Sequence, residues 1–213
     1  MDVIVDGKPQ AAGASATAFE TVTRIGRDLR AEGRAIVDIC VDGERIGPED
    51  LETRLGDKAA AAPGSITIAS EALNTLTRGA ISSLRDVLPE LPKACRTLAA
   101  IFQGESPESG FESFSHVFDI WSQIKQRQQE IASALGASPD TIYMDGGAVA
   151  DINEDLNRAV VDAYEALKAK DWVLLGDHLE YELAPRAERE QAIVNRLAQL
   201  ADAPADSPAC GVR

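Results

Sequence analysis

The sequence has few aromatic residues and few histidines, and each shortage narrows the range of functions. Aromatic side chains make up 5% of the 213 residues, so alanine and the aliphatic residues must supply most of the core. Such a composition suits closely packed helices better than a large aromatic-lined pocket. The two histidines leave little scope for nucleophilic catalysis, and no G-x-S-x-G, phosphate-loop or dinucleotide-binding motif is present. We therefore expect a protein that is not an enzyme and needs no cofactor.

Cysteine is also scarce. Cys40, Cys95 and Cys210 are far apart and odd in number, which argues against a disulfide framework and against a cysteine-based metal site. Cys40 falls in a predicted strand and Cys95 on an apolar helical seam, so both are expected to be packing residues and not reactive thiolates. The start, "MDVIVDGK", lacks the basic and apolar segments of a secretion signal. These features favour a reducing, cytoplasmic setting.

Positive charge is in short supply as well. The formal net charge is -14, and no run of lysine and arginine resembles the basic stripe that phosphate contacts need. Nucleic acid is therefore excluded as a partner, and anionic lipid surfaces are disfavoured. A membrane span is not expected either, since no apolar run reaches about 18 residues.

The first third of the sequence alternates between apolar and polar residues and predicts strands. Two alternating segments meet Asp-Gly turns, at Asp6–Gly7 and Asp42–Gly43, which is a strong hairpin signal. Between them, Thr17 is placed to cap a helix that ends near Gly33. Pro48 is positioned to start a short helical turn, and "SITIA" predicts one more strand.

This order of elements resembles that of the β-grasp fold of the ubiquitin-like superfamily, over residues 1–68. Members of that superfamily that are conjugated or carry sulfur act through a free C-terminal Gly-Gly. In this sequence the chain continues and its end reads "CGVR". The resemblance therefore implies a scaffold or docking module, and a carrier role is implied only weakly.

After Ile68 the apolar rhythm becomes helical, and only helices and loops are expected beyond it. We predict an α+β protein in which an antiparallel bundle of about four helices, 69–201, follows the small domain and a disordered tail, 202–213, ends the chain. Pro89 and Pro92 are expected to break the first helical seam. "ASPDTIYMDGGAV" has the composition of a connection. The helical segments are predicted at about 73–102, 111–135, 152–167 and 171–200.

The stretch "DWVLLGDHLEYELAP" combines leucines and aromatics with acidic residues. Asp171 is placed to cap a helix, and Pro185 should bend or divide it. Where a seam bends it can expose a binding groove, so we expect a helix of another protein to dock at four residues, Trp172, Leu175, Tyr181 and Leu183. The alternatives are that the partner pairs with an edge of the small sheet, or that it is a second copy of this chain, which would form a homodimer.

The same stretch resembles a recurring "DyvlL-D-LEYEL-P" helix of uncharacterised bacterial proteins, some connected with flagellar or cell-surface functions. The likeness covers "KDWVLLGDHLEYELAP" and implies a family of helical proteins. It assigns no catalytic residue. Together with the absence of catalytic motifs, it favours an adaptor or chaperone-like binding protein.

A rival hypothesis uses the two histidines. His178 and Glu182 are one helical turn apart, and His116 with Asp119 lies on another predicted helix. Facing helices could bring these side chains together, as in metal-binding bundles, although the Glu-x-x-His pattern of di-iron proteins is missing. The alternative is thus a metal- or small-molecule-binding bundle, or an enzyme, centred on His116, His178 and Glu182.

Overall fold

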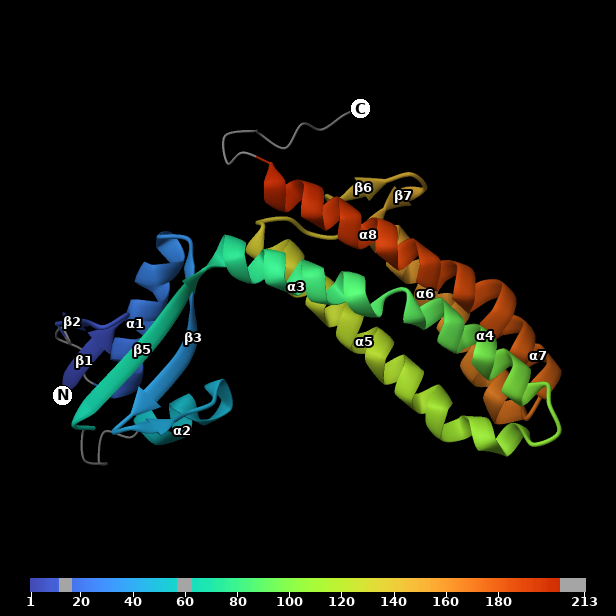
Figure 1. Ribbon diagram of the computed structural model, residues 1–213, viewed down its shortest axis with the longest axis horizontal. Helices are drawn as coiled ribbons and strands as arrows, with labels where there is room; N and C mark the ends of the chain where they lie inside the picture. Colours follow the sequence, from blue (N-terminus) through green and yellow to red (C-terminus); the bar gives the residue numbers. More distant parts are fainter. Residues whose placement is uncertain (12–16, 57–62, 204–213) are drawn as a thin grey trace. The chain divides into compact units, whose positions relative to one another are not determined.

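The computed structural model describes residues 1–11, 17–56 and 63–203. The chain is of the α+β class and divides into two compact units, Met1–Leu76 and Thr77–Arg213 (Figure 1). The sequence pattern placed the change of structure at Ile68, whereas the first unit continues to Leu76. Each unit has its own hydrophobic core.

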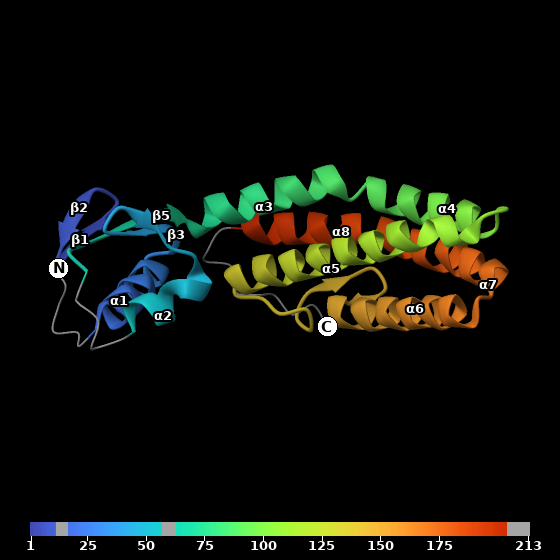
Figure 2. The same ribbon diagram turned by 90° about the horizontal axis from the view of Figure 1, so that it is seen from below.

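The N-terminal unit contains a five-stranded mixed sheet with the order β2-β1-β5-β3-β4. β1 pairs with β5 in parallel, and the other neighbours are antiparallel. Helix α1 packs on the sheet (Figures 1 and 2). The elements are β1 (Asp2–Val5), β2 (Lys8–Gln10), α1 (Ala18–Ala31), β3 (Arg34–Val41), β4 (Glu44–Arg45), a short 3-10 turn (Pro48–Asp50), α2 (Leu51–Leu55) and β5 (Ser65–Ala72).

The predicted local signals of this unit are confirmed. Both Asp-Gly turns have positive φ at each residue, 49° and 77° at Asp6–Gly7 and 50° and 86° at Asp42–Gly43, which matches the right-handed twist of hairpin strands. The Thr17 side chain accepts a hydrogen bond from the Glu20 N–H, and the Glu20 carboxylate accepts one from the Thr17 N–H. This capping box starts α1.

The sheet extends further than the sequence indicated, which corrects the prediction that strands end at Ile68. β5 continues to Ala72 because β3 pairs with it along this length, from Val41–Ile66 to Arg34–Ala72. Asp6 fastens the same region: its carboxylate accepts hydrogen bonds from the Ser70 N–H and hydroxyl, both at 2.7 Å. Long-range pairing thus keeps "ASEA" extended, although its own residues do not favour a strand.

A second correction concerns the segment predicted to be a plain connection. It forms a small hairpin of β6 (Tyr143–Met144) and β7 (Gly147–Ala148). Gly146 and Gly147 have φ values of 111° and 121°, which only glycine adopts easily. The two glycines therefore allow a tight turn between two strands of 2 residues each. Strands this short show no alternating pattern, so the sequence did not reveal them.

The second unit consists mainly of helices α3 to α8. Helix α4 packs against α5, α7 and α8, and α6 packs against α7 (Figure 2). The expected break at the two prolines is confirmed, since α3 ends at Val87 and α4 begins at Glu90. The bounds are α3 (Leu73–Val87), α4 (Glu90–Phe102), a 3-10 turn (Pro107–Gly110), α5 (Phe111–Ala134), α6 (Val149–Ala169), α7 (Trp172–Asp177) and α8 (Ala184–Asp202).

A π-helical turn, His178–Leu183, joins α7 to α8 just before Pro185. Pro185 has no backbone N–H to donate within a continuous α-helix, and the chain changes its helical register over these 6 residues. The predicted division of this helix therefore takes the form of a π turn. Asp171 caps α7, accepting a bond from the Leu174 N–H at 3.0 Å, as predicted. Asp202 ends α8, while 204–213 of the predicted tail lie outside the described residues.

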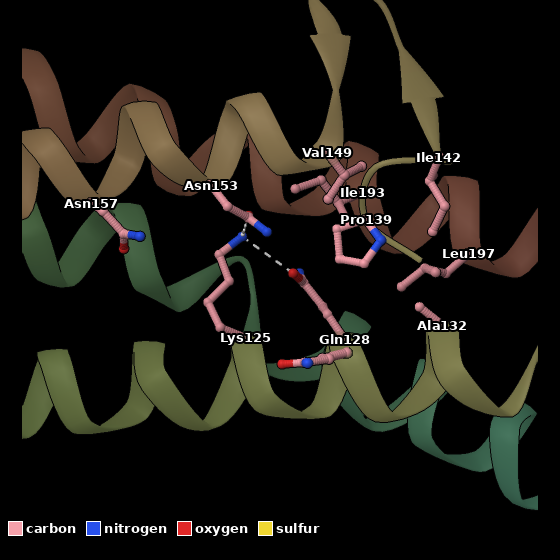
Figure 3. Close-up of a pocket in the computed structure, with 11 residues that line it drawn as sticks. Lys125, Gln128, Ala132, Pro139, Ile142, Val149, Asn153, Asn157, Ile193 and Leu197 are labelled. Carbon is pink, nitrogen blue, oxygen red and sulfur yellow. Dashed lines mark hydrogen bonds between the residues drawn. The ribbon is translucent and has the colours of Figure 1, made fainter. Parts of the chain in front are cut away.

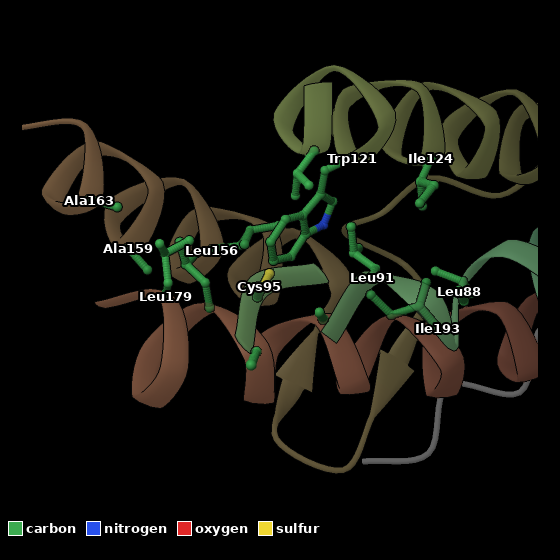
Figure 4. Close-up of a cluster of buried hydrophobic side chains, with 14 of the residues drawn as sticks. Leu88, Leu91, Cys95, Trp121, Ile124, Leu156, Ala159, Ala163, Leu179 and Ile193 are labelled. Atoms are coloured by element: carbon green, nitrogen blue, oxygen red, sulfur yellow. The ribbon is translucent and has the colours of Figure 1, made fainter. Parts of the chain in front are cut away.

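The core of the helical unit is formed by side chains from α4, α5, α6, the π turn and α8, among them Trp121 and Leu179 (Figure 4). Cys95 is fully buried in it, and burial raises the pKa of its thiol to about 12. Cys40 is half-buried, and Cys210 lies outside the described residues. Cys95 is therefore a packing residue, as predicted.

Candidate functional site

The four residues predicted to dock a partner do not share one surface. Leu175 and Leu183 have 0% of their surface exposed, as does Leu179 between them. Residues four apart share one face of a regular α-helix, and the wider π turn keeps these leucines aligned through the change of register. These leucines belong to the core, and a partner cannot reach them in this structure.

Trp172 lies in an aromatic cluster at one end of the helical unit. Its ring stacks on Phe102 at a centroid distance of 6.0 Å and lies 5.7 Å from Phe111. The side chain is half-buried. Beside it, the Gln103 side chain donates to the Val173 carbonyl and the Asp177 carboxylate, which attaches α7 to the end of α4. Trp172 therefore mainly packs the end of the helical bundle.

Tyr181 is different, because 65% of its surface is exposed. With Leu174, which is 45% exposed, it lines a groove of about 550 Å³ beside α6. We call this the α6–α7 groove. Its other lining residues are Asp155, Arg158, Ala159, Asp162, Asp177, His178, Glu182 and Arg186.

One arginine organises the charged wall of the α6–α7 groove. The Arg186 guanidinium donates to both carboxylate oxygens of Asp155, at 2.9 and 3.3 Å, and to the Glu182 carboxylate at 2.6 Å. It also donates to the Glu182 backbone carbonyl at 2.7 Å. Hydrogen bonding to Arg186 lowers the pKa of Asp155, so this carboxylate stays ionised. The fork ties α6 to α8 and fixes the wall.

The proposed metal ligands do not assemble. His116 is exposed on α5, His178 lines the α6–α7 groove, and Glu182 is paired with Arg186. Asp119 is also exposed on α5. Within residues 1–11, 17–56 and 63–203, no group of three or more histidine, cysteine, aspartate or glutamate side chains could hold a metal ion.

A buried polar cluster is the feature that sequence reasoning missed. Glu190, on α8, has only 1% of its surface exposed. Its carboxylate accepts hydrogen bonds from the Trp121 indole at 3.3 Å, the Gln128 amide at 2.8 Å and the Lys125 ammonium at 2.7 Å. All three donors project from α5, so the cluster joins α5 to α8.

Lys125 has an acceptor for each of its three protons: the Glu190 carboxylate, the Asn153 carbonyl oxygen at 2.7 Å and the Gln128 carbonyl oxygen at 3.2 Å. Burial lowers the pKa of Lys125, and Glu190 opposes that shift. The Glu190 carboxylate stabilises the protonated ammonium, and all three ammonium protons are donated in hydrogen bonds within the cluster.

Lys125 and Gln128 also line a cavity of about 170 Å³ (Figure 3). We call it the Lys125 cavity. Helices α5, α6 and α8 and the loop before β6 form its walls. The other lining residues are Gln129, Ala132, Pro139, Ile142, Val149, Asn153, Asn157, Ile193 and Leu197.

A signal for this cluster was present in the sequence. Gln128 falls at a seam position between Ile124 and Ile131, and Glu190 falls between Ala187 and Ile193. A polar residue at an apolar position is a reason to look for a partner on a facing helix. The spacing could not identify that partner, because it lies 62 residues away along the chain.

The chain matches the model of a family described as Domain of unknown function (DUF8042) over residues 80–192, more than half of its length. It therefore belongs to that family. No curated protein and no solved structure matches it. Within the described part of the chain, no helix is both long and apolar enough to span a membrane.

Proposed function

We propose that this DUF8042 protein is a non-enzymatic adaptor whose α6–α7 groove binds an amphipathic helix of another protein. The observation that supports this most is the exposure of Leu174 and Tyr181 within one groove. Tyrosine offers a large apolar ring with a polar end, and such residues often anchor interfaces. An apolar stripe on a partner helix would cover both side chains.

The charges around the groove indicate the chemistry of the partner. Carboxylates outnumber guanidinium groups in the lining: Asp155, Asp162, Asp177 and Glu182 against Arg158 and Arg186. Arg186 is already engaged by two of these carboxylates, whereas Asp162 and Asp177 face the groove from opposite helices. We therefore propose a partner helix that carries lysine or arginine beside its apolar stripe.

The N-terminal unit would be the second part of the adaptor. We propose that it is a β-grasp domain used for docking, a proposal supported by its strand order and by α1 packing on the sheet. Its edge strands, β2 and β4, could pair with an extended segment. The segment 170–185 resembles bacterial proteins connected with flagellar or cell-surface functions. We therefore propose that the partner is a cytoplasmic protein with a flagellar or cell-surface function.

The test is site-specific photo-crosslinking in cells that produce the protein. Benzoylphenylalanine replaces Tyr181 in one variant and Tyr164 in another; Tyr164 is a matched control because it is 52% exposed on α6 but does not line the groove. The cross-linked protein is identified, purified and titrated against the wild-type chain and against Leu174→Asp, Tyr181→Ala and Tyr164→Ala.

We expect a partner that cross-links at Tyr181 alone and whose Kd rises by at least about tenfold for Leu174→Asp and Tyr181→Ala. The Tyr164→Ala variant should bind like the wild type. Cross-linking to a second copy of this chain would contradict the adaptor proposal and support a homodimer instead. Equal affinity for all variants would exclude the groove as the binding surface.

A further inference from the structure

The Lys125 cavity has two chemically distinct ends. Lys125, Gln128, Gln129, Asn153 and Asn157 supply an ammonium and four amides. The remaining lining residues are apolar: Ala132, Pro139, Ile142, Val149, Ile193 and Leu197. Figure 3 shows Lys125 and Asn153 meeting at the polar end, while Ile142 and Leu197 lie at the other. A ligand that fits both ends must itself have a polar head and an apolar body.

Charge determines what kind of head the cavity accepts. Lys125 is the charged residue of the lining, and its charge is already balanced by Glu190 at 2.7 Å. An anionic head would have to share Lys125 with Glu190, whose side chain is 2% exposed, and one negative charge would be left in a poorly solvated site. A cationic head would meet the ammonium and be repelled.

The amides have capacity for an uncharged head. Gln128 is engaged at both ends, by Lys125 and by Glu190. The Asn153 carbonyl accepts from Lys125, which leaves its NH₂ group to donate. Asn157 and Gln129 add both donors and acceptors at the exposed rim of the cavity. A primary amide or an alcohol can use such donors and acceptors together.

The volume limits the size of the body. A cavity of about 150 Å³ holds a benzene-sized molecule. At about 170 Å³, the Lys125 cavity has space for roughly six to eight non-hydrogen atoms. That is enough for a short branched aliphatic chain beyond the head.

We propose that the Lys125 cavity binds a small uncharged amphiphile, with an amide or hydroxyl head at Asn153 and Asn157 and a short aliphatic body against Ile193 and Leu197. This binding site is separate from the α6–α7 groove, and it depends on no partner protein. Its occupation would fill the space between α5, α6 and α8.

The experiment uses two probes of the same shape, isovaleramide and isovalerate, which differ in the charge of the head. The full-length chain, labelled with ¹⁵N, is titrated with each at constant pH and ionic strength, and amide shifts are followed by NMR. We expect saturable shifts of residues around 125–132, 139–157 and 193–197 with isovaleramide, and a Kd at least about tenfold higher for isovalerate.

Three variants locate the binding. Ala132→Leu extends a side chain into the cavity and should abolish the shifts, while Asn157→Ala, at an exposed position that does not threaten folding, should raise the Kd several-fold. Tyr181→Ala, in the α6–α7 groove, should leave the Kd unchanged, so failure of the adaptor proposal and failure of this one are distinguishable. Shifts that do not saturate, that map elsewhere or that persist in Ala132→Leu would overturn the proposal. Equal binding of the two probes would overturn the requirement for an uncharged head.

Discussion

One ion pair in each unit illustrates a difference between an exposed and a buried charge. In the N-terminal unit the ion pair Asp6–Arg34 is partly exposed, with 35% of each side chain accessible, and the core beneath is aliphatic. In the helical unit the pair Lys125–Glu190 lies inside, with Glu190 only 2% accessible. An exposed pair adds little stability, whereas a buried pair is costly to break. The pair Asp6–Arg34 therefore lies at the surface of the first unit, whereas the pair Lys125–Glu190 joins α5 to α8 from inside the second.

The strongest way to test this contrast is Glu190→Ala. It leaves the Lys125 ammonium, whose side chain is 22% accessible, without its counter-ion, and we expect the free energy of unfolding to fall by about 3 kcal/mol, toward the lower end of the cost of breaking a buried pair. Both tryptophans, Trp121 and Trp172, lie in the helical unit, so urea unfolding followed by tryptophan fluorescence and by far-UV circular dichroism measures the loss.

The control is the double variant Lys125→Met with Glu190→Leu, which removes both charges and keeps apolar volume. It should be much more stable than Glu190→Ala. If Glu190→Ala unfolds at the same urea concentration as the wild type, the buried pair has no structural importance.

The next largest effect on stability is expected from replacing one core residue in each unit. Ile25 is 1% exposed beneath the sheet, and Leu179 is 0% exposed in the π turn. Replacing either with alanine should lower the stability of its own unit by about 2–5 kcal/mol, through lost burial and the cavity left behind. Tryptophan fluorescence reports Leu179→Ala, and NMR-detected hydrogen exchange of β3 and β5 reports Ile25→Ala. Exchange that is equally slow in Ile25→Ala and wild type would contradict the compact core of the first unit.

Helix caps should show a smaller effect that is similar in the two units. Thr17→Ala removes the capping box of α1, and Asp171→Ala removes the N-cap of α7. Each should lower stability by about 0.5–2 kcal/mol, because backbone N–H groups lose their acceptor. Thr17→Ser and Asp171→Asn retain a capping oxygen and should recover most of the loss in the same urea titrations.

The smallest effect is expected at Asp6, and it depends on pH. Hydrogen bonds from Ser70, helped by Arg34, lower the pKa of Asp6 below its ordinary 3.8. Its contribution to stability is therefore complete above that value and lost as the pH falls through the lower pKa of the folded state. Asp6→Asn keeps the positive-φ turn but not the ion pair. NMR-monitored urea titrations should place it slightly below wild type at pH 7 and equal to it near pH 2; a gap that widens in acid would contradict this.

Much of the N-terminal unit could be predicted because its signals are local. Asp6–Gly7 and Asp42–Gly43 specify tight turns through their own backbone preferences, and Thr17 caps a helix within one turn. The same holds for Asp171 and for the break near Pro89. The extension of β5 to Ala72 was missed because pairing with β3, distant in the sequence, imposes it.

The site was harder to predict than the fold. Tyr181 is exposed, as a docking residue must be, but Leu175 and Leu183 lie in the core. The spacing of these leucines indicates one apolar helix face, and spacing alone does not say whether other helices of the same chain or a partner cover that face. The Lys125 cavity depends on three helices and a loop meeting at one place. Gln128 stands out in the sequence as a polar residue at a seam position, whereas Lys125, Asn153 and Asn157 are recognised only by their neighbours in space.

The π turn His178–Leu183 also bears on how sequences of the DUF8042 family should align. A turn of this kind is equivalent to one residue inserted into an α-helix. Relatives that lack the insertion should be one residue shorter between the positions of Asp171 and Pro185, with a regular helix there. In those relatives the leucine pattern should change from intervals of four to alternating intervals of three and four, so a single gap in an alignment would mark where the groove changes shape.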